Sequence, residues 1–126
     1  MGLTRLTMAV SNVSNPSRFR EVHFLIDSGA VYSLVPREVL SQLGIVPQRV
    51  HFFSMVDGTE IQREVGHAMF TFEGRAAPSP VIFGEPGDQP LLGATTLEAM
   101  EPGSRSVSTR VEANGLAAVK TNPALD

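Results

Sequence analysis

The chain has 126 residues, a length that predicts one domain spanning residues 1–126. Its hydrophobic share of 42% is ordinary for a globular protein, and its charged share of 18% is on the low side. Its formal net charge of −3, without a basic cluster, argues against nucleic acid or an anionic membrane as the main partner. The sequence contains no cysteine, which excludes disulfides, a thiol nucleophile and any Cys-based metal site.

No apolar run is long enough to cross a bilayer, and the first ten residues lack the sustained apolar core of a signal peptide. We therefore expect a cytoplasmic protein that does not bind membranes. The histidines, His23, His51 and His67, are scattered without an i,i+4 pair. A zinc site needs converging ligands, so we expect neither a metal nor a cofactor.

The first part of the chain alternates between strand and turn signals. We expect an edge strand at 3–10, a turn at 11–17, a strand at 19–26, a turn at 27–31 and a strand at 32–35. The pair Asn15-Pro16 marks the first turn. In the second strand, Val22, Phe24 and Ile26 share one face.

A short helix and a hairpin follow. Residues 36–44 predict a helix, because Pro36 suits its first turn, Leu40 and Leu43 share an apolar face, and Gly44 suits the position after its end. The dipeptide Asp57-Gly58 is a strong hairpin signal between strands at 49–56 and 59–65.

The last elements are short. We expect a strand at 68–73, a turn at 74–75, an interruption at Pro78-Ser79-Pro80, a strand at 81–83, a loop at 84–90 and a strand at 91–92. Thr95 and Glu98 have the spacing of a capping box, so a second helix should begin there. Short strands with Gly and Pro between them predict an all-β, barrel-like domain.

Two motifs carry the functional signal. The apolar run at 22–26 ends in Asp27-Ser28-Gly29-Ala30, which places a carboxylate in a tight turn within apolar surroundings. Such a carboxylate needs hydrogen bonds, a partner that shares its charge, or a raised pKa. The second motif is Leu91-Leu92-Gly93-Ala94, a short strand that leads into a helix. In this order, the motifs and elements over residues 20–100 resemble the retropepsin-like (retroviral-type, clan AA) aspartic proteases, in particular the small prokaryotic ones.

The resemblance implies an acid-protease fold that forms half of a two-fold symmetric homodimer, because the chain contains a single Asp-Ser-Gly. Asp27 would be catalytic, sharing one proton with Asp27 of a second copy. Ser28 would hydrogen-bond across the dimer axis, Gly29 would turn its N–H toward the carboxylate, and Ala30 would complete the turn. Without the resemblance, Asp27 would be interpreted as an ordinary turn cap.

The hairpin tip of Met55, Val56, Asp57, Gly58 and Thr59 would be the flap that closes over a substrate peptide. Phe53, Met55 and Ile61 would add apolar walls, although a plain surface hairpin has the same sequence signal. The second motif would pack beneath the Asp27 turn, where Gly93 lets two chain segments cross closely; a strand end before a helix is the alternative.

Residues 101–126 depart from the family pattern. The stretch Glu101-Pro102-Gly103-Ser104-Arg105-Ser106 breaks the helix, and a strand-like pattern resumes at 107–112. One hypothesis is a pair of compensating frameshifts that replaced Gly-Leu-Glu-Val-Asp-Pro; real divergence is the other. Either way we expect a weakened dimer, and expect the hexapeptide to strengthen it.

The function predicted from these residues is a homodimeric aspartic endopeptidase that needs no cofactor. Its activity should show a bell-shaped profile on the acidic side and resist chelators. Two alternatives stay open: a retropepsin-like dimer with little or no turnover that binds peptides or serves assembly, and an unrelated small β-barrel.

Overall fold

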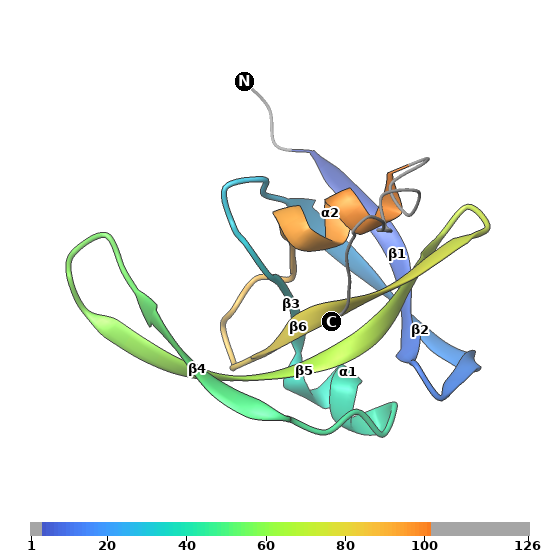
Figure 1. Cartoon of the computed structure of the whole chain (residues 1–126), viewed down its shortest axis with the longest axis horizontal. Helices are drawn as coiled ribbons and strands as arrows, with labels where there is room; N and C mark the ends of the chain where they lie inside the picture. Colours follow the sequence, from blue (N-terminus) through green and yellow to red (C-terminus); the bar gives the residue numbers. More distant parts are fainter. Residues whose placement is uncertain (1–3, 102–126) are drawn as a thin grey trace, which may run out of the picture.

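Seven strands and two short helices make up residues 4–101, the part of the chain that the computed structural model describes (Figure 1). The elements in chain order are β1 (Arg5–Asn12), β2 (Asn15–Ile26), β3 (Ser33–Pro36), α1 (Arg37–Gln42), β4 (Arg49–Ser54), β5 (Glu60–Phe72), β6 (Arg75–Gly84), β7 (Leu91–Leu92) and α2 (Ala94–Met100). No helix within these residues is both long and apolar enough to span a membrane.

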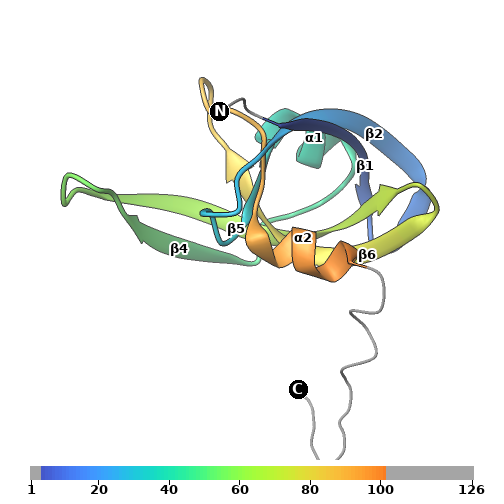
Figure 2. The same ribbon diagram turned by 90° about the horizontal axis from the view of Figure 1, so that it is seen from above.

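The strands form one sheet that curls into a ring. Their order is β1-β2-β7-β3-β6-β5-β4, and β1 also pairs with β5, which closes the ring and leaves β4 outside it. The β4–β5 hairpin therefore extends beyond the ring, as Figures 1 and 2 show. The core inside the ring is apolar and includes Phe24, Phe70, Phe83, Leu40 and Leu92. The predicted all-β, barrel-like fold is confirmed in this ring-like form.

The start of the sheet differs from the prediction in two respects. β1 is not an edge strand, because it pairs with β2 along its length and with β5 at Ala9, Val10 and Ser11. The predicted turn at 11–17 is shorter, since both strands continue into it. The Asn12 side chain accepts hydrogen bonds from the Ser14 N–H and hydroxyl, which confines the turn to two residues.

β5 and β6 are each one continuous strand, where the sequence predicted breaks. In β5, Gly66 does not interrupt the strand; it permits close approach, because a Cβ there would lie 2.9 Å from the Val46 carbonyl oxygen. In β6, Pro78 and Pro80 pair with β5, and β3 joins the other edge only from Val81 onward. The prolines thus sit where a missing N–H costs no bond to β3.

The helices lie near their predicted positions. Gly44 adopts a φ of +77° after α1, a left-handed conformation that glycine tolerates, as predicted. The prediction of a capping box is wrong, because α2 begins at Ala94, Gly93 occupies the N-cap position, and no side chain caps the helix. Apart from Glu101, the atypical segment at 101–126 and the hexapeptide hypothesis lie outside the described residues.

Candidate active site

The Asp27 turn is held by two local hydrogen bonds. The Ala30 N–H donates to the Asp27 carbonyl oxygen at 3.0 Å, which closes a four-residue turn. The Gly29 N–H donates to Asp27 Oδ1, also at 3.0 Å, as predicted. This bond is the one that an ordinary Asx turn makes. Here it also fixes the direction of the carboxylate.

The carboxylate is exposed in the single chain, although the sequence predicted apolar surroundings. Asp27, Ser28 and Gly29 are all exposed, and the preceding Leu25 and Ile26 are half-buried. The Ser28 hydroxyl makes no hydrogen bond with another residue of 4–101. Within residues 4–101, the Asp27 carboxylate is therefore not enclosed by other side chains.

β7 anchors the backbone on which Asp27 sits. This strand lies between β2 and β3, parallel to β2 at Ile26 and Leu92 and antiparallel to β3 at Leu34 and Leu91. The Asp27 N–H donates to the Leu92 carbonyl oxygen at 3.0 Å. The two sequence motifs are therefore direct neighbours, as predicted.

Gly93 is required by the crossing of the two motifs. A Cβ at this position would lie 2.5 Å from the Tyr32 carbonyl oxygen and 2.9 Å from that of Ala30, both closer than real contacts allow. The next two N–H groups, of Ala94 and Thr95, donate to the carbonyl oxygens of Ala30 and Val31 at 2.7 and 3.0 Å. The loop that follows Asp27 thus satisfies the first N–H groups of α2.

A chain of buried hydroxyls joins the elements beneath the turn. Thr96 Oγ1 on α2 lies 2.6 Å from Ser33 Oγ on β3 and 2.8 Å from Ser79 Oγ on β6. Ser33 Oγ also accepts the Gly93 N–H at 3.0 Å. All three side chains are fully buried or nearly so. Sequence reasoning missed them, since no local pattern distinguishes a hydroxyl that bonds across the fold from one that faces water.

Thr96→Val should lower the free energy of unfolding by about 1–3 kcal/mol, because it keeps the shape but removes the hydroxyl to which both Ser33 and Ser79 bond, and so leaves each of these buried hydroxyls one hydrogen bond short. Denaturant unfolding of the full chain measures this loss. The control is Thr95→Val, which removes a half-buried hydroxyl without a hydrogen bond to another residue of 4–101. Equal stability of the two variants would contradict the role of the network.

The predicted flap tip is a tight, exposed turn. The Met55 N–H donates to the Thr59 carbonyl oxygen at 2.7 Å, and Gly58 has a φ of +92°. Asp57 Oδ1 accepts the Thr59 hydroxyl at 2.7 Å and the Thr59 N–H at 3.0 Å. These two hydrogen bonds hold the pKa of Asp57 below its usual value, and the bond from the Thr59 hydroxyl has the larger effect. Val56 is fully exposed at the tip.

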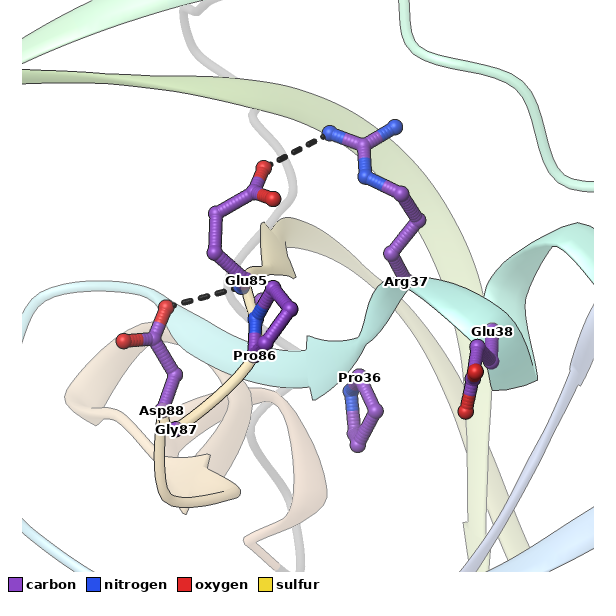
Figure 3. A pocket seen from close by; sticks show the side chains of 8 residues that line it. Pro36, Arg37, Glu38, Glu85, Pro86, Gly87 and Asp88 are labelled. Carbon is purple, nitrogen blue, oxygen red and sulfur yellow. Dashed lines mark hydrogen bonds and ion pairs between the residues drawn. The ribbon is translucent and has the colours of Figure 1, made fainter.

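Charged residues connect β5, at the base of the hairpin, to α1 and to the loop before β7. Arg37 on α1 binds Glu64 on β5 at 2.6 Å and Glu85 at 3.0 Å, and these carboxylates raise its pKa, Glu85 more strongly. Arg37 and Glu85 border a cavity of about 430 Å³ against the loop before β7 (Figure 3). In that loop, Asp88 accepts the Glu85 N–H at 2.9 Å and binds Arg63 of β5 at 3.5 Å.

These side chains are partly exposed, so each pair adds little stability by itself. Within residues 4–101, no three His, Asp or Glu side chains are grouped closely enough to hold a metal ion.

Comparisons with known proteins agree with this geometry. The sequence matches the aspartyl protease family over residues 12–96. No protein with a curated description matches it significantly. Among solved structures, the EIAV protease complexed with an inhibitor is 16% identical, with a TM-score of 0.54 over 77% of this chain and 86% of that chain. The simian foamy virus (mac) protease is 22% identical, with a TM-score of 0.49 over 73% of this chain and 91% of that chain.

The EIAV enzyme shows that the fold is that of a retroviral protease. The family match covers more than half of the chain and contains the Asp27 turn, the hairpin and the Leu91-Leu92-Gly93-Ala94 motif. This chain therefore belongs to the aspartyl protease family of peptide hydrolases and is retropepsin-like in fold.

Proposed function

We propose that the protein is a homodimeric aspartic endopeptidase in which two Asp27 carboxylates, one from each subunit, activate a water molecule. The observation that carries this proposal is the state of Asp27 in the single chain. Its carboxylate is oriented by the Gly29 N–H, and its backbone is anchored on β7. The carboxylate is nevertheless exposed, and the sequence contains no second Asp-Ser-Gly that could supply a partner for it. A second copy supplies the missing carboxylate.

The chemistry follows from two carboxyl groups that share one proton. Side by side, two carboxylates cannot both stay ionised, so the pair titrates as a unit. The ionised member accepts a proton from the water, which attacks the peptide carbonyl carbon, while the protonated member donates to the carbonyl oxygen. Transfer of a proton to the amide nitrogen then lets the C–N bond break, without a covalent enzyme intermediate.

The remaining residues of the site support this step. The Ser28 hydroxyl beside Asp27 has no hydrogen-bond partner among residues 4–101, so it can bond to the second copy and hold the two turns together. The β4–β5 hairpin, with its tip at Asp57 and Gly58, covers an extended peptide and offers it main-chain hydrogen bonds. The substrate is therefore a peptide or protein segment in extended conformation.

Dilution tests the requirement for two copies. Specific activity on a peptide library should fall once the protein concentration drops below the dimer dissociation constant, and sedimentation of the same samples should show monomers there. Constant specific activity across the dissociation would contradict the shared site. A dimer that cleaves nothing in the library at any acidic pH would favour a peptide-binding module instead.

A further inference from the structure

The buried hydroxyls beneath the candidate catalytic turn form a chain of hydrogen bonds with one direction. The Gly93 N–H can only donate, and Ser33 Oγ accepts it at 3.0 Å. At the other end, the Ser79 hydroxyl donates to the Pro80 carbonyl oxygen at 3.3 Å. Each hydroxyl has a single hydrogen to donate. All the bonds can therefore form together only if Ser33 donates to Thr96 and Thr96 donates to Ser79.

This hydroxyl chain, made by Ser33, Thr96 and Ser79, begins at the peptide unit that holds the Asp27 backbone. The Leu92 carbonyl and the Gly93 N–H belong to one planar peptide unit. Its carbonyl oxygen accepts the Asp27 N–H at 3.0 Å, and its N–H donates to Ser33 Oγ, also at 3.0 Å. One rigid plane thus joins the buried hydroxyls on one side to the aspartate on the other.

Little else restrains the rotation of this peptide unit. It follows β7, a strand of only two residues, and Gly93 has no side chain that would resist a change of its backbone angles. The Ser33 hydroxyl fixes the N–H, and it is fully buried, so water does not take its place when it is removed. Hydrogen bonds in a chain also polarise one another, which strengthens the bond that the Leu92 carbonyl accepts.

We propose that Ser33, Thr96 and Ser79 are positioning residues, which set the direction of the Asp27 carboxylate through the Leu92–Gly93 peptide unit. The inference rests on the proposed function, because this direction matters for catalysis only if Asp27 takes part in the reaction. The three side chains are buried beneath the turn and act through the backbone. Their removal should therefore lower kcat and leave KM nearly unchanged.

The loss of kcat should depend on the place of each residue in the hydroxyl chain. Ser33→Ala removes the acceptor of the Gly93 N–H, and kcat per folded molecule should fall about tenfold, since small misplacements of a reacting group are costly. Ser79→Ala, at the far end, should lower kcat by no more than about twofold. Thr96→Ser keeps every bond and should retain the wild-type kcat, whereas Thr96→Val should lower it about fivefold. Because the Thr96 pair differs in the hydroxyl, it decides the question even if Ser33→Ala does not fold.

Hydrogen exchange of the Asp27 amide tests the same link without any catalysis. This amide is bonded to the Leu92 carbonyl oxygen, so it should exchange about tenfold faster in full-length Thr96→Val than in Thr96→Ser. The amides of β5 in the same sample report overall unfolding, and the rate is corrected for it. As a matched control, Thr71→Val removes a half-buried hydroxyl of β5 that bonds to no other residue of 4–101. It should leave both kcat and the Asp27 exchange rate unchanged.

An Asp27 exchange rate that is equal in Thr96→Val and Thr96→Ser overturns the proposal, whatever the activity. A faster exchange with equal kcat in these two variants overturns the effect on catalysis. Equal losses of kcat in Ser33→Ala and Ser79→Ala, in proportion to unfolding, would show a purely structural role. If the wild-type chain cleaves no peptide, the proposed function fails by itself, and the exchange rate still decides whether the hydroxyl chain positions the turn.

Discussion

Asp27→Asn is expected to lower proteolytic activity by about a hundredfold to ten-thousandfold, the range that a general acid–base group contributes. The amide has nearly the volume of the carboxyl, so the turn is retained. It cannot accept a proton from water or share one with a second carboxyl group. The measurement is turnover of a peptide library at acidic pH, together with unfolding and sedimentation to show that fold and association are unchanged.

Asp57→Asn is the matched control for this substitution. Asp57 is also an exposed turn aspartate that accepts bonds from a residue two positions later, but it lies at the hairpin tip. The Asp57→Asn variant should lose little proteolytic activity compared with the Asp27→Asn variant. Unchanged cleavage by Asp27→Asn would remove this carboxylate from the mechanism.

Gly93→Ala is expected to cost about 3 kcal/mol of unfolding free energy, at the high end for overpacked sites. The added Cβ would collide with backbone rather than with a mobile side chain, so relief requires the loop after Asp27 to move. Activity should therefore fall further than the loss of folded protein explains. Denaturant unfolding and turnover of the same preparation separate the two effects.

Gly87→Ala controls for the general cost of replacing a glycine. A Cβ at Gly87 meets no atom within 4 Å, but the residue has a φ of +92°. The cost there should be about 1–2 kcal/mol from backbone strain alone. If Gly93→Ala costs no more than this control, the close crossing beneath the catalytic turn is not the constraint described here.

The parts of the site that the sequence predicted are those with local signals. Asp27 follows an apolar strand and precedes Gly29, and Gly58 follows Asp57 in a hairpin dipeptide, so a few neighbouring residues determine each turn. The close crossing at Gly93 was predicted from the resemblance, and its geometry is confirmed. The catalytic role of Asp27 and the flap role of the hairpin stay predictions.

The parts that escaped prediction depend on tertiary contacts. The sequence predicted that Thr95 and Glu98 would cap α2, but carbonyl oxygens of the Asp27 loop satisfy the first N–H groups of this helix. Thr96 carried no signal, yet its hydroxyl bonds to β3 and β6. Pro78 looked like a strand break because sequence does not reveal which edge of β6 lacks a partner. His51 appeared isolated because Tyr32 meets it only after folding.

The shared catalytic site is tested most directly by mixing wild-type chain with an excess of Asp27→Asn. At a ninefold excess of the variant, only about one wild-type chain in ten pairs with another wild-type chain after subunit exchange. If each site needs two Asp27 residues, the activity per wild-type chain therefore falls about tenfold. Addition of the variant immediately before the assay, without time for exchange, is the control. Activity that stays proportional to the wild-type chain after exchange would contradict a site built from two copies.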